Sequence, residues 1–351
     1  MSAPSSLVHQ RLDPVAPGSP LEQEIIGLRR ACFPEMVGTP QDTLEYWRWK
    51  FTASSSGEQA EAWGTRLAET QELIGFYAAS PLTYQSPQGP LRAGLVFEVM
   101  TSPKARGKGV FTAIGHAATA GMTGPSGFRF LTGYPIRPEV LPGHRKVGWI
   151  FREQLPVYVA PCLRLWGALP WLRAKASGLS IERLEDARML AELPGFEDFR
   201  RAWSEQATRE RWIAVQNDAA FLRWRYGPPG VRYQAVVVRD REGRLQGYVT
   251  GRQMSLKGVP SFAIADIRTL SDSAIYGLTA GLLFGSSLRT LLLAGMFSKT
   301  MARAVGLWKV GFVPTPQKFW LILKPEAALH EAYTTDASGR FYLAWGDTDD
   351  I

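Results

Sequence analysis

The stretch Lys104–Ile114, KARGKGVFTAI, decides how the rest of the sequence is interpreted. Two glycines stand one residue apart among basic side chains, just before a run with helical spacing. From Val110 onward apolar residues recur at intervals of three and four, which predicts a helix with one buried face. Before the stretch, Leu95–Thr101 (LVFEVMT) predicts a strand. The segment is therefore predicted to be a strand, a glycine-rich turn and a helix.

A turn of this kind suits an anionic group. The first amides of a helix are unpaired and the helix dipole adds positive charge there, so phosphate binds well at this place. Gly107 and Gly109 permit a positive φ and a close backbone approach, and the basic side chains add attraction. The Walker pattern is absent, and Thr112 stands where the dinucleotide fingerprint needs a third glycine. By itself the turn either binds phosphate or only caps a helix.

The chain contains an internal duplication, so its 351 residues are expected to form two domains. Trp-Arg pairs occur in YWRWKF at 46–51 and in FLRWRY at 221–226. Each half then has a strand with an acid, VFEVM or AIADI, and ends in HRKVGW or LWKVGF. The pattern predicts two copies of one α+β fold. The predicted domains are residues 1–155 and 194–351, with 156–193 as an inter-domain connector.

Two stretches raise the question of a membrane. Residues 156–179 are rich in Pro, Trp and Arg, and these side chains either pack between the domains or lie on a membrane surface; we expect packing. Ile275–Phe297 reaches membrane-spanning length, but Arg289 and a Gly-Ser-Ser sequence interrupt it. A helix that ends near Ser287, followed by a buried strand at Thr290–Ala294, explains it better. No membrane span is predicted.

The composition is that of an ordinary globular protein, with 45% hydrophobic and 21% charged residues. Lys and Arg outnumber Asp and Glu by 40 to 32, and the net charge of +8 favours an anionic ligand or an acidic partner. The basic residues are scattered, so nucleic acid is not expected. Two cysteines and four histidines without a CxxC motif predict neither a disulfide framework nor a metal site. The first residues lack a basic start with an apolar core, so the expected location is the cytoplasm.

The order of strand, SPKARGKGVFTAI, helix, strand and helix ending in Gly-aromatic resembles the GNAT superfamily of acyl-CoA-dependent N-acyltransferases. Its signature, [Q/R]xxGxG/A, is matched by Lys104–Gly109 with lysine at the first position. The paired WRWK and LRWRY segments and the terminal FYLAWGDTDD are similar to a tandem-GNAT group. The resemblance implies an α+β fold of two GNAT-like domains, each a mixed, mainly antiparallel sheet flanked by helices. It also implies that acetyl-CoA or another acyl-CoA binds at Met100, Lys104, Ala105, Arg106, Gly107, Lys108, Gly109 and Val110.

The resemblance also suggests catalytic groups. A carboxylate on the strand before the phosphate turn often accepts the proton of the amine in this family, and Glu98 matches that position. The alternative is a carboxylate paired with an arginine. The family often has a tyrosine four residues before the Gly-aromatic pair, where His144 stands here. His144 is therefore either an acid for the departing thiolate or a surface histidine. Tyr134, after the middle strand, is a second candidate for this acid.

The second copy departs from the pattern. After the Asp266 strand comes RTLSDSAIYGLTAGL, which has neither the glycine pair nor a basic cluster. We expect this copy to shape the acceptor pocket rather than bind CoA. The resemblance implies an enzyme that transfers an acyl group from acyl-CoA directly to a primary amine of a small molecule, such as an amino sugar or a specialised metabolite, without a metal. The alternatives are a donor held on an acyl carrier protein, or a non-catalytic protein that binds CoA or an acidic partner.

Overall fold

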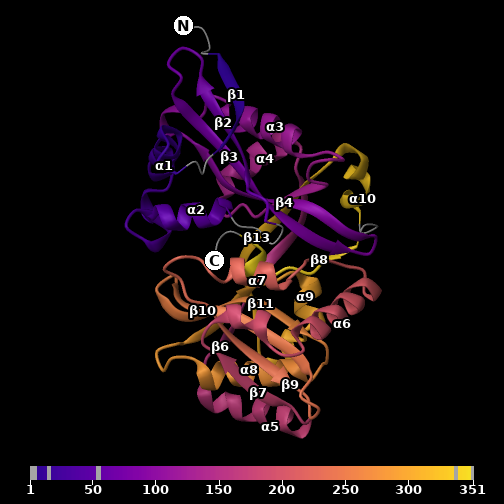
Figure 1. Cartoon of the computed structure of the whole chain (residues 1–351). Helices are drawn as coiled ribbons and strands as arrows, with labels where there is room; N and C mark the ends of the chain where they lie inside the picture. The colour runs from indigo at the N-terminus through magenta and orange to yellow at the C-terminus, as the bar shows by residue number, and fades with distance from the viewer. Residues whose placement is uncertain (1–5, 14–16, 53–56, 336–338, 349–351) are drawn as a thin grey trace.

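The computed structural model describes residues 6–13, 17–52, 57–335 and 339–348. Two halves lie one above the other in Figure 1, each a sheet with helices packed against it, and the N-terminal half is drawn in indigo and magenta. The predicted α+β class is confirmed. The elements of the first half are β1 Leu7–Leu12, α1 Pro20–Cys32, α2 Leu44–Thr52, β2 Glu61–Leu67, β3 Leu73–Ser86, β4 Gly89–Thr101, α3 Val110–Met122, β5 Phe130–Gly133, α4 Leu141–Val147 and β6 Ile150–Pro161.

The elements of the second half are α5 Ala168–Ala176, β7 Ser180–Leu184, α6 Phe196–Arg209, β8 Trp212–Val215, α7 Ala219–Arg225, β9 Gln234–Arg239, β10 Leu245–Leu256, β11 Val259–Thr269, α8 Ala274–Gly285, β12 Leu292–Met296, α9 Lys299–Ala304, β13 Val313–Pro325, α10 His330–Thr334 and β14 Arg340–Phe341. From its first strand to its last long strand, the second half repeats the order of the first with one additional strand, β8, after α6. Helix α5 precedes the repeated series, and α10 and β14 follow it.

The two halves exchange their last long strands. The strand order along the sheet is β1-β2-β3-β4-β5-β13-β6-β12-β11-β10-β9-β7. Strand β13, from the second half, pairs with β5 of the first half, and β6, from the first half, pairs with β12 of the second. The exchanged strands also pair with each other, antiparallel, at the centre. Separating the halves would therefore break backbone hydrogen bonds on both sides of each exchanged strand.

Alternation along β3 divides the core of the first half into two layers. Phe76 and Ala78 belong to the apolar cluster beneath α1 and α2, whereas Tyr77 and Ala79 belong to the cluster beneath α3. This is the period of two expected of a strand with both faces covered. Helix α1 begins where the Ser19 hydroxyl accepts a hydrogen bond from the backbone of α1 at 3.1 Å, which caps its free amides.

The connector contains regular structure. Strand β6 runs through the predicted boundary at residue 155, and β7, inside residues 156–193, pairs with β9 as β1 pairs with β2. Counted by strand pairing, the second series of elements begins at β7. The division of the chain into domains stays a proposal.

The long apolar stretch forms a helix and a strand. Helix α8 ends at Gly285 and β12 starts at Leu292, close to the predicted positions. Helix α8 is buried along most of its length because α5 and strands of the second half pack around it. Among the described residues, no helix has both the length and the hydropathy needed to cross a membrane.

The expectation that the tryptophans of residues 156–179 pack between the halves is wrong. Trp166 and Trp171 keep 59% and 40% of their surface exposed. They lie in or next to α5, which is at the bottom of Figure 1, at the end of the molecule remote from the first half. The junction of the halves contains a different pair, Trp49 and Trp224, whose rings stack at 5.9 Å between centroids.

Candidate functional site

A β-bulge in β4 creates the opening in which the site lies. Phe76 pairs with Met100 and Ala78 with Phe97, so that Glu98 and Val99 both face one residue of β3. Glu98 has a φ of 50°, in the left-handed region. A side-chain-bearing residue in such a conformation costs about 1–3 kcal/mol, and strain of this kind concentrates at functional sites.

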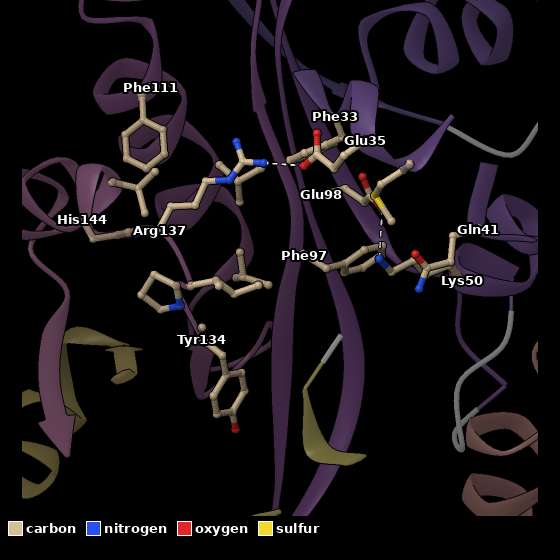
Figure 2. Close-up of a pocket in the computed structure, with 17 residues that line it drawn as sticks. Phe33, Glu35, Gln41, Lys50, Phe97, Glu98, Phe111, Tyr134, Arg137 and His144 are labelled. Atoms are coloured by element: carbon tan, nitrogen blue, oxygen red, sulfur yellow. Dashed lines mark hydrogen bonds and ion pairs between the residues drawn. The ribbon is translucent and has the colours of Figure 1, made fainter. Parts of the chain in front are cut away.

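The bulge lies just beyond the residues at which β4 pairs with its parallel neighbour, β5. Strands β4 and β5 pair only from Ala93 to Leu95, opposite Phe130–Thr132. Beyond these residues the two strands part, and a cavity of about 300 Å³ lies in the wedge between them. Figure 2 shows its lining residues converging from the two strands and from α2, α3 and α4. They are Phe33, Glu35, Met36, Gln41, Lys50, Val96, Phe97, Glu98, Val99, Phe111, Gly133, Tyr134, Pro135, Ile136, Arg137, Val140 and His144.

The glycine-rich turn has the geometry that the sequence predicts. Gly107 and Gly109 have φ values of 75° and 80°, and a Cβ added to either would meet nothing within 4 Å. Gly109 is the N-cap of α3, and no side chain caps this helix end. The turn therefore presents its backbone to open space. The basic residues Lys104, Arg106 and Lys108 are exposed around it.

Ala105 and Met100, which are predicted to bind acyl-CoA, have buried side chains. Ala105 is buried against Ile74 and Val110, which fixes the turn to the end of the sheet. Met100 is 1% exposed and packs in the cluster beneath α1 and α2. Its side chain faces the core, so only its backbone is available to a ligand.

Glu98 is held by two cations. Its Oε2 accepts a hydrogen bond from Arg29 Nε at 3.1 Å, and its Oε1 accepts one from Lys50 Nζ at 2.9 Å. The alternative of a carboxylate paired with an arginine therefore describes the resting geometry, with Lys50 as an additional partner. Burial raises the pKa of Glu98, but the charges of Lys50 and Arg29 and their hydrogen bonds outweigh it and lower the pKa below its usual value. The carboxylate is ionised at neutral pH.

His144 lines the same cavity and is not a surface residue. It is 6% exposed and packs edge-to-face against the rings of Phe111 and Trp149. Its Nδ1 is buried and forms no hydrogen bond among the described residues. Burial lowers the pKa of His144 to about 4, so the ring is neutral at pH 7. An acid role for His144 requires a neutral imidazole N–H as donor, or a bound ligand that raises its pKa.

Tyr134 reaches the cavity less directly. It follows β5 and lines the wedge, but in Figure 2 its hydroxyl points away from the other labelled side chains. Burial raises its pKa well above the usual value, and Tyr84 and Thr132 lie beside the hydroxyl. Glu98, His144 and Tyr134 thus all line one cavity.

An exposed ion pair spans the mouth of the cavity. Arg137 Nη2 lies 2.6 Å from Glu35 Oε1, and the Arg137 guanidinium lies 5.5 Å from the centre of the Phe33 ring. This pair joins the segment after β5 to the segment after α1. Figure 2 shows the dashed contact near the top of the site. Because both side chains are at least half exposed, the pair is worth less than about 1 kcal/mol.

Arg29, Lys50 and the Arg137–Glu35 pair belong to the site but were not predicted from the sequence. Lys50 had a visible signal, because it is the last basic residue of WRWK, and the repeated segment has Arg225 at that place. Arg29 had none, since it lies 69 residues from Glu98 in the sequence. Among the described residues, no group of three or more His, Cys, Asp or Glu side chains could hold a metal ion.

The matching wedge of the second half is filled by the chain itself. Strands β11 and β12 pair from Ser261 to Ala263 and then part, as β4 and β5 do. Residues 341–348 are buried in this region. The Tyr342 hydroxyl donates to Ile267 O at 2.8 Å, and Arg225 donates to Gly346 O at 2.6 Å and to Thr348 O at 2.8 Å.

Asp266 is enclosed in the same region. Its Oδ2 accepts hydrogen bonds from the Tyr248 hydroxyl at 2.8 Å and from Asn217 Nδ2 at 2.6 Å, and it pairs with Arg268 at 3.2 Å. Every one of these partners is buried. The Asp266 carboxylate, at the second wedge, therefore has a structural role: it binds three buried side chains.

Comparison with known proteins identifies the fold. No family model matches the sequence, and no curated protein matches it. Among solved structures, the GCN5-related N-acetyltransferases of Anabaena variabilis and Kribbella flavida match 91% and 93% of this chain and 72% of their own, with TM-scores of 0.63 and 0.62 and identities of 14% and 12%. The N-myristoyltransferase of Saccharomyces cerevisiae with bound myristoyl-CoA matches 92% of this chain and 84% of its own, with a TM-score of 0.53 and 12% identity. The predicted GNAT fold is confirmed.

Proposed function

We propose that this protein transfers an acyl group from acyl-CoA to a primary amine of a small molecule, in a complex of both substrates. The continuity of the glycine-rich turn with the wedge carries the proposal. Val110 begins α3 at the turn, and the next residue, Phe111, lines the cavity. A ligand with a phosphate end and an extended thioester arm would contact both places. The yeast N-myristoyltransferase of similar fold was solved with bound myristoyl-CoA.

The turn supplies the donor site in this proposal. The free amides at the start of α3 and its dipole attract the pyrophosphate, and the exposed basic side chains add to the field. The two glycines leave the backbone uncovered, so phosphate oxygens can approach to hydrogen-bond distance. The thioester then lies in the wedge, where β4 and β5 have parted and their backbone groups are free to bind it.

The cavity supplies the chemistry. The amine nitrogen attacks the thioester carbonyl carbon, the C–N bond forms, the C–S bond breaks, and the nitrogen loses a proton as the sulfur gains one. We assign the uptake of the amine proton to Glu98, which is ionised. His144, neutral at pH 7, is the candidate donor to the sulfur, with Tyr134 as the alternative. Release of Glu98 from Lys50 would accompany proton uptake.

Thiol release tests the proposal directly. The purified protein is incubated with acetyl-CoA and a panel of amines that includes amino sugars, and free CoA thiol is measured over time. We expect release that requires both the protein and an amine. Longer acyl-CoAs are tested in the same way. Binding of acyl-CoAs without thiol release from any of them would contradict the enzyme and favour a non-catalytic CoA-binding protein.

A second experiment distinguishes a donor held on an acyl carrier protein from free acyl-CoA. The exposed basic residues of the turn would also attract an acidic acyl carrier protein, and such an attraction weakens with salt. Acyl transfer from acyl carrier protein but not from acyl-CoA, with a rate that falls as salt is added, would replace the CoA donor in the proposal. Transfer from free acyl-CoA in the absence of a carrier protein would support the CoA donor.

A further inference from the structure

The second half carries an exposed apolar surface that the proposed function does not use. Three segments form it: 162–175 in and before α5, 284–291 from the end of α8 onward, and 303–313 from the end of α9 to the start of β13. Its most exposed large side chains are Leu165 at 90%, Leu288 at 81%, Trp308 at 72%, Trp166 at 59%, and Leu169 and Leu291 at 58% each. We call this surface the α5 face. Apolar groups of this size gathered on one surface indicate a binding partner.

The three segments are contiguous in space. The side chains of α5 surround a hollow of about 570 Å³ together with residues of α8, Lys309 and Val310. Arg164 Nη2 donates to Ser286 O at 2.8 Å, which ties the start of the face to the segment after α8. The hollow is lined mainly by leucine, tryptophan and other apolar side chains, so it suits hydrocarbon better than a polar ligand.

The charges on this face are all of one sign. The three segments contain Arg164, Arg173, Lys175, Arg289, Arg303 and Lys309 and no acidic residue. An acidic side chain from outside them, Asp272, pairs with Lys309 at 2.7 Å. Lys175 lies 5.9 Å from the centre of the Trp171 ring, and Arg173 lies 5.1 Å from that of Tyr276. Leucine and tryptophan side chains with basic residues among them are typical of segments that lie in the interface of an anionic membrane.

From these observations we propose that the α5 face docks on the surface of an anionic phospholipid bilayer. Leu165, Trp166 and Leu169 enter the headgroup region, and the basic side chains contact lipid phosphates. A second copy of this chain fits less well, because a symmetric contact would place the basic residues of one copy against those of the other. The strands that line the wedge belong to the first half, whereas α5 lies at the end of the second half that is remote from it (Figure 1).

Vesicle sedimentation with the full chain tests the docking. The protein is mixed with vesicles of phosphatidylcholine alone or of phosphatidylcholine with phosphatidylglycerol, and the bound fraction is measured at rising salt. We expect binding to the anionic vesicles at least about tenfold stronger than to the neutral ones. The double variant Leu165→Ser/Trp166→Ser should lose about tenfold in binding. Met189→Ser, at another exposed apolar residue, should bind like the parent.

Two double variants distinguish an effect of the α5 face from an effect of the net charge of the protein. Arg173→Glu/Lys175→Glu and Arg201→Glu/Arg209→Glu change the net charge equally, and all four residues are exposed. Only the first should weaken binding to the anionic vesicles. Equal losses in both, or no vesicle binding by the parent, would overturn the proposal. A parent dimer that Leu165→Ser/Trp166→Ser converts to a monomer in sedimentation velocity, without vesicle binding, would replace the bilayer by a second copy.

Discussion

The two halves open the same wedge in their sheets and fill it differently. In the first half, β4 and β5 part around a cavity beside a glycine-rich turn with three exposed basic residues. In the second half, β11 and β12 part in the same register, but residues 341–348 of the chain occupy the opening and no glycine pair precedes α8. The comparison indicates that the wedge is a property of the fold, whereas a ligand site depends on leaving it open.

The same repeat position shows this difference most clearly. Lys50 and Arg225 occupy the same position, the fifth, in the two repeated Trp-Arg segments. Lys50 holds the Glu98 carboxylate at the cavity, whereas Arg225 holds two backbone carbonyls of the C-terminal segment. Lys50 is therefore assigned to the chemistry of the open wedge in the first half, and Arg225 to the stability of the filled wedge in the second half.

The largest expected effect is on turnover. Glu98→Gln should lower the rate of acyl transfer by about 10²–10⁴-fold, because the amide cannot take a proton from the amine. Thiol release at saturating substrates gives the rate. Glu35→Gln, at an exposed residue of the same cavity, is the control and should keep most of the rate. Turnover of Glu98→Gln close to that of the parent would show that this carboxylate only supports the structure.

The second largest expected effect is a loss of stability in the second half. Arg225→Ala removes two charge-assisted hydrogen bonds and leaves buried carbonyls unpaired, so it should lower the free energy of unfolding by about 3–6 kcal/mol. Denaturant titration measures it. Arg223→Ala, on the same helix with an exposed partner in Glu192, should cost less than about 1 kcal/mol. Similar losses for the two variants would mean that the C-terminal segment is not held as described.

Buried carboxyl groups should respond to pH in opposite directions in the two halves. Burial, and then the charge of Asp266, raise the pKa of Asp347 to about 7. The folded protein keeps this proton to a higher pH than the unfolded chain, so the contribution of Asp347 to stability falls as pH rises from about 4 to 7. Glu98 has a lowered pKa, so its contribution is present at neutral pH and is lost as pH falls.

Variants isolate these contributions from other titrating groups such as His144. The free energy of unfolding of Asp347→Asn, relative to the parent, should rise by a few kcal/mol between pH 5 and pH 7, because the amide has no proton to lose. That of Glu98→Gln, relative to the parent, should fall as pH rises from acid to neutral. Denaturant titrations at several pH values measure both. Slopes of the same sign in the two variants would contradict the assignment of one ionised and one protonated carboxyl.

The smallest effect concerns the mouth of the first wedge. Arg137→Ala breaks an exposed ion pair, so stability should change by less than about 1 kcal/mol. If the pair positions the segments that enclose the acceptor, KM for the amine should rise by about two- to fivefold while the affinity for acyl-CoA stays constant. An unchanged KM for every accepted amine would exclude a role for the pair in acceptor binding.

Local features were predictable from the sequence, and long-range ones were not. Spacing and turn chemistry predict the strand, the turn at Gly107 and Gly109 and helix α3, because each depends on neighbours in the chain. The exchange of β6 and β13 was not predictable, since an apolar strand has the same pattern whichever strand it pairs with. The placement of residues 341–348 depends on Arg225, more than a hundred residues away. Trp166 was expected to be buried between the halves but is exposed, because apolar residues also make up much of the surface of folded proteins.

The central claim is that the first half, with its glycine-rich turn and open wedge, holds the single donor site. Calorimetric titration with acetyl-CoA, and with a longer acyl-CoA if acetyl-CoA does not bind, tests it most directly. Gly107→Glu/Gly109→Glu places side chains in the space proposed for the phosphates. Gly195→Glu is the matched control, because Gly195 is also a helix N-cap with a φ of 81° and open space around its Cβ position.

We predict one acyl-CoA bound per chain, with an affinity that falls at least about a hundredfold in the double variant and is unchanged in Gly195→Glu. Binding of two molecules per chain, or undiminished binding in the double variant, would contradict the division of the fold into an open half and a closed half.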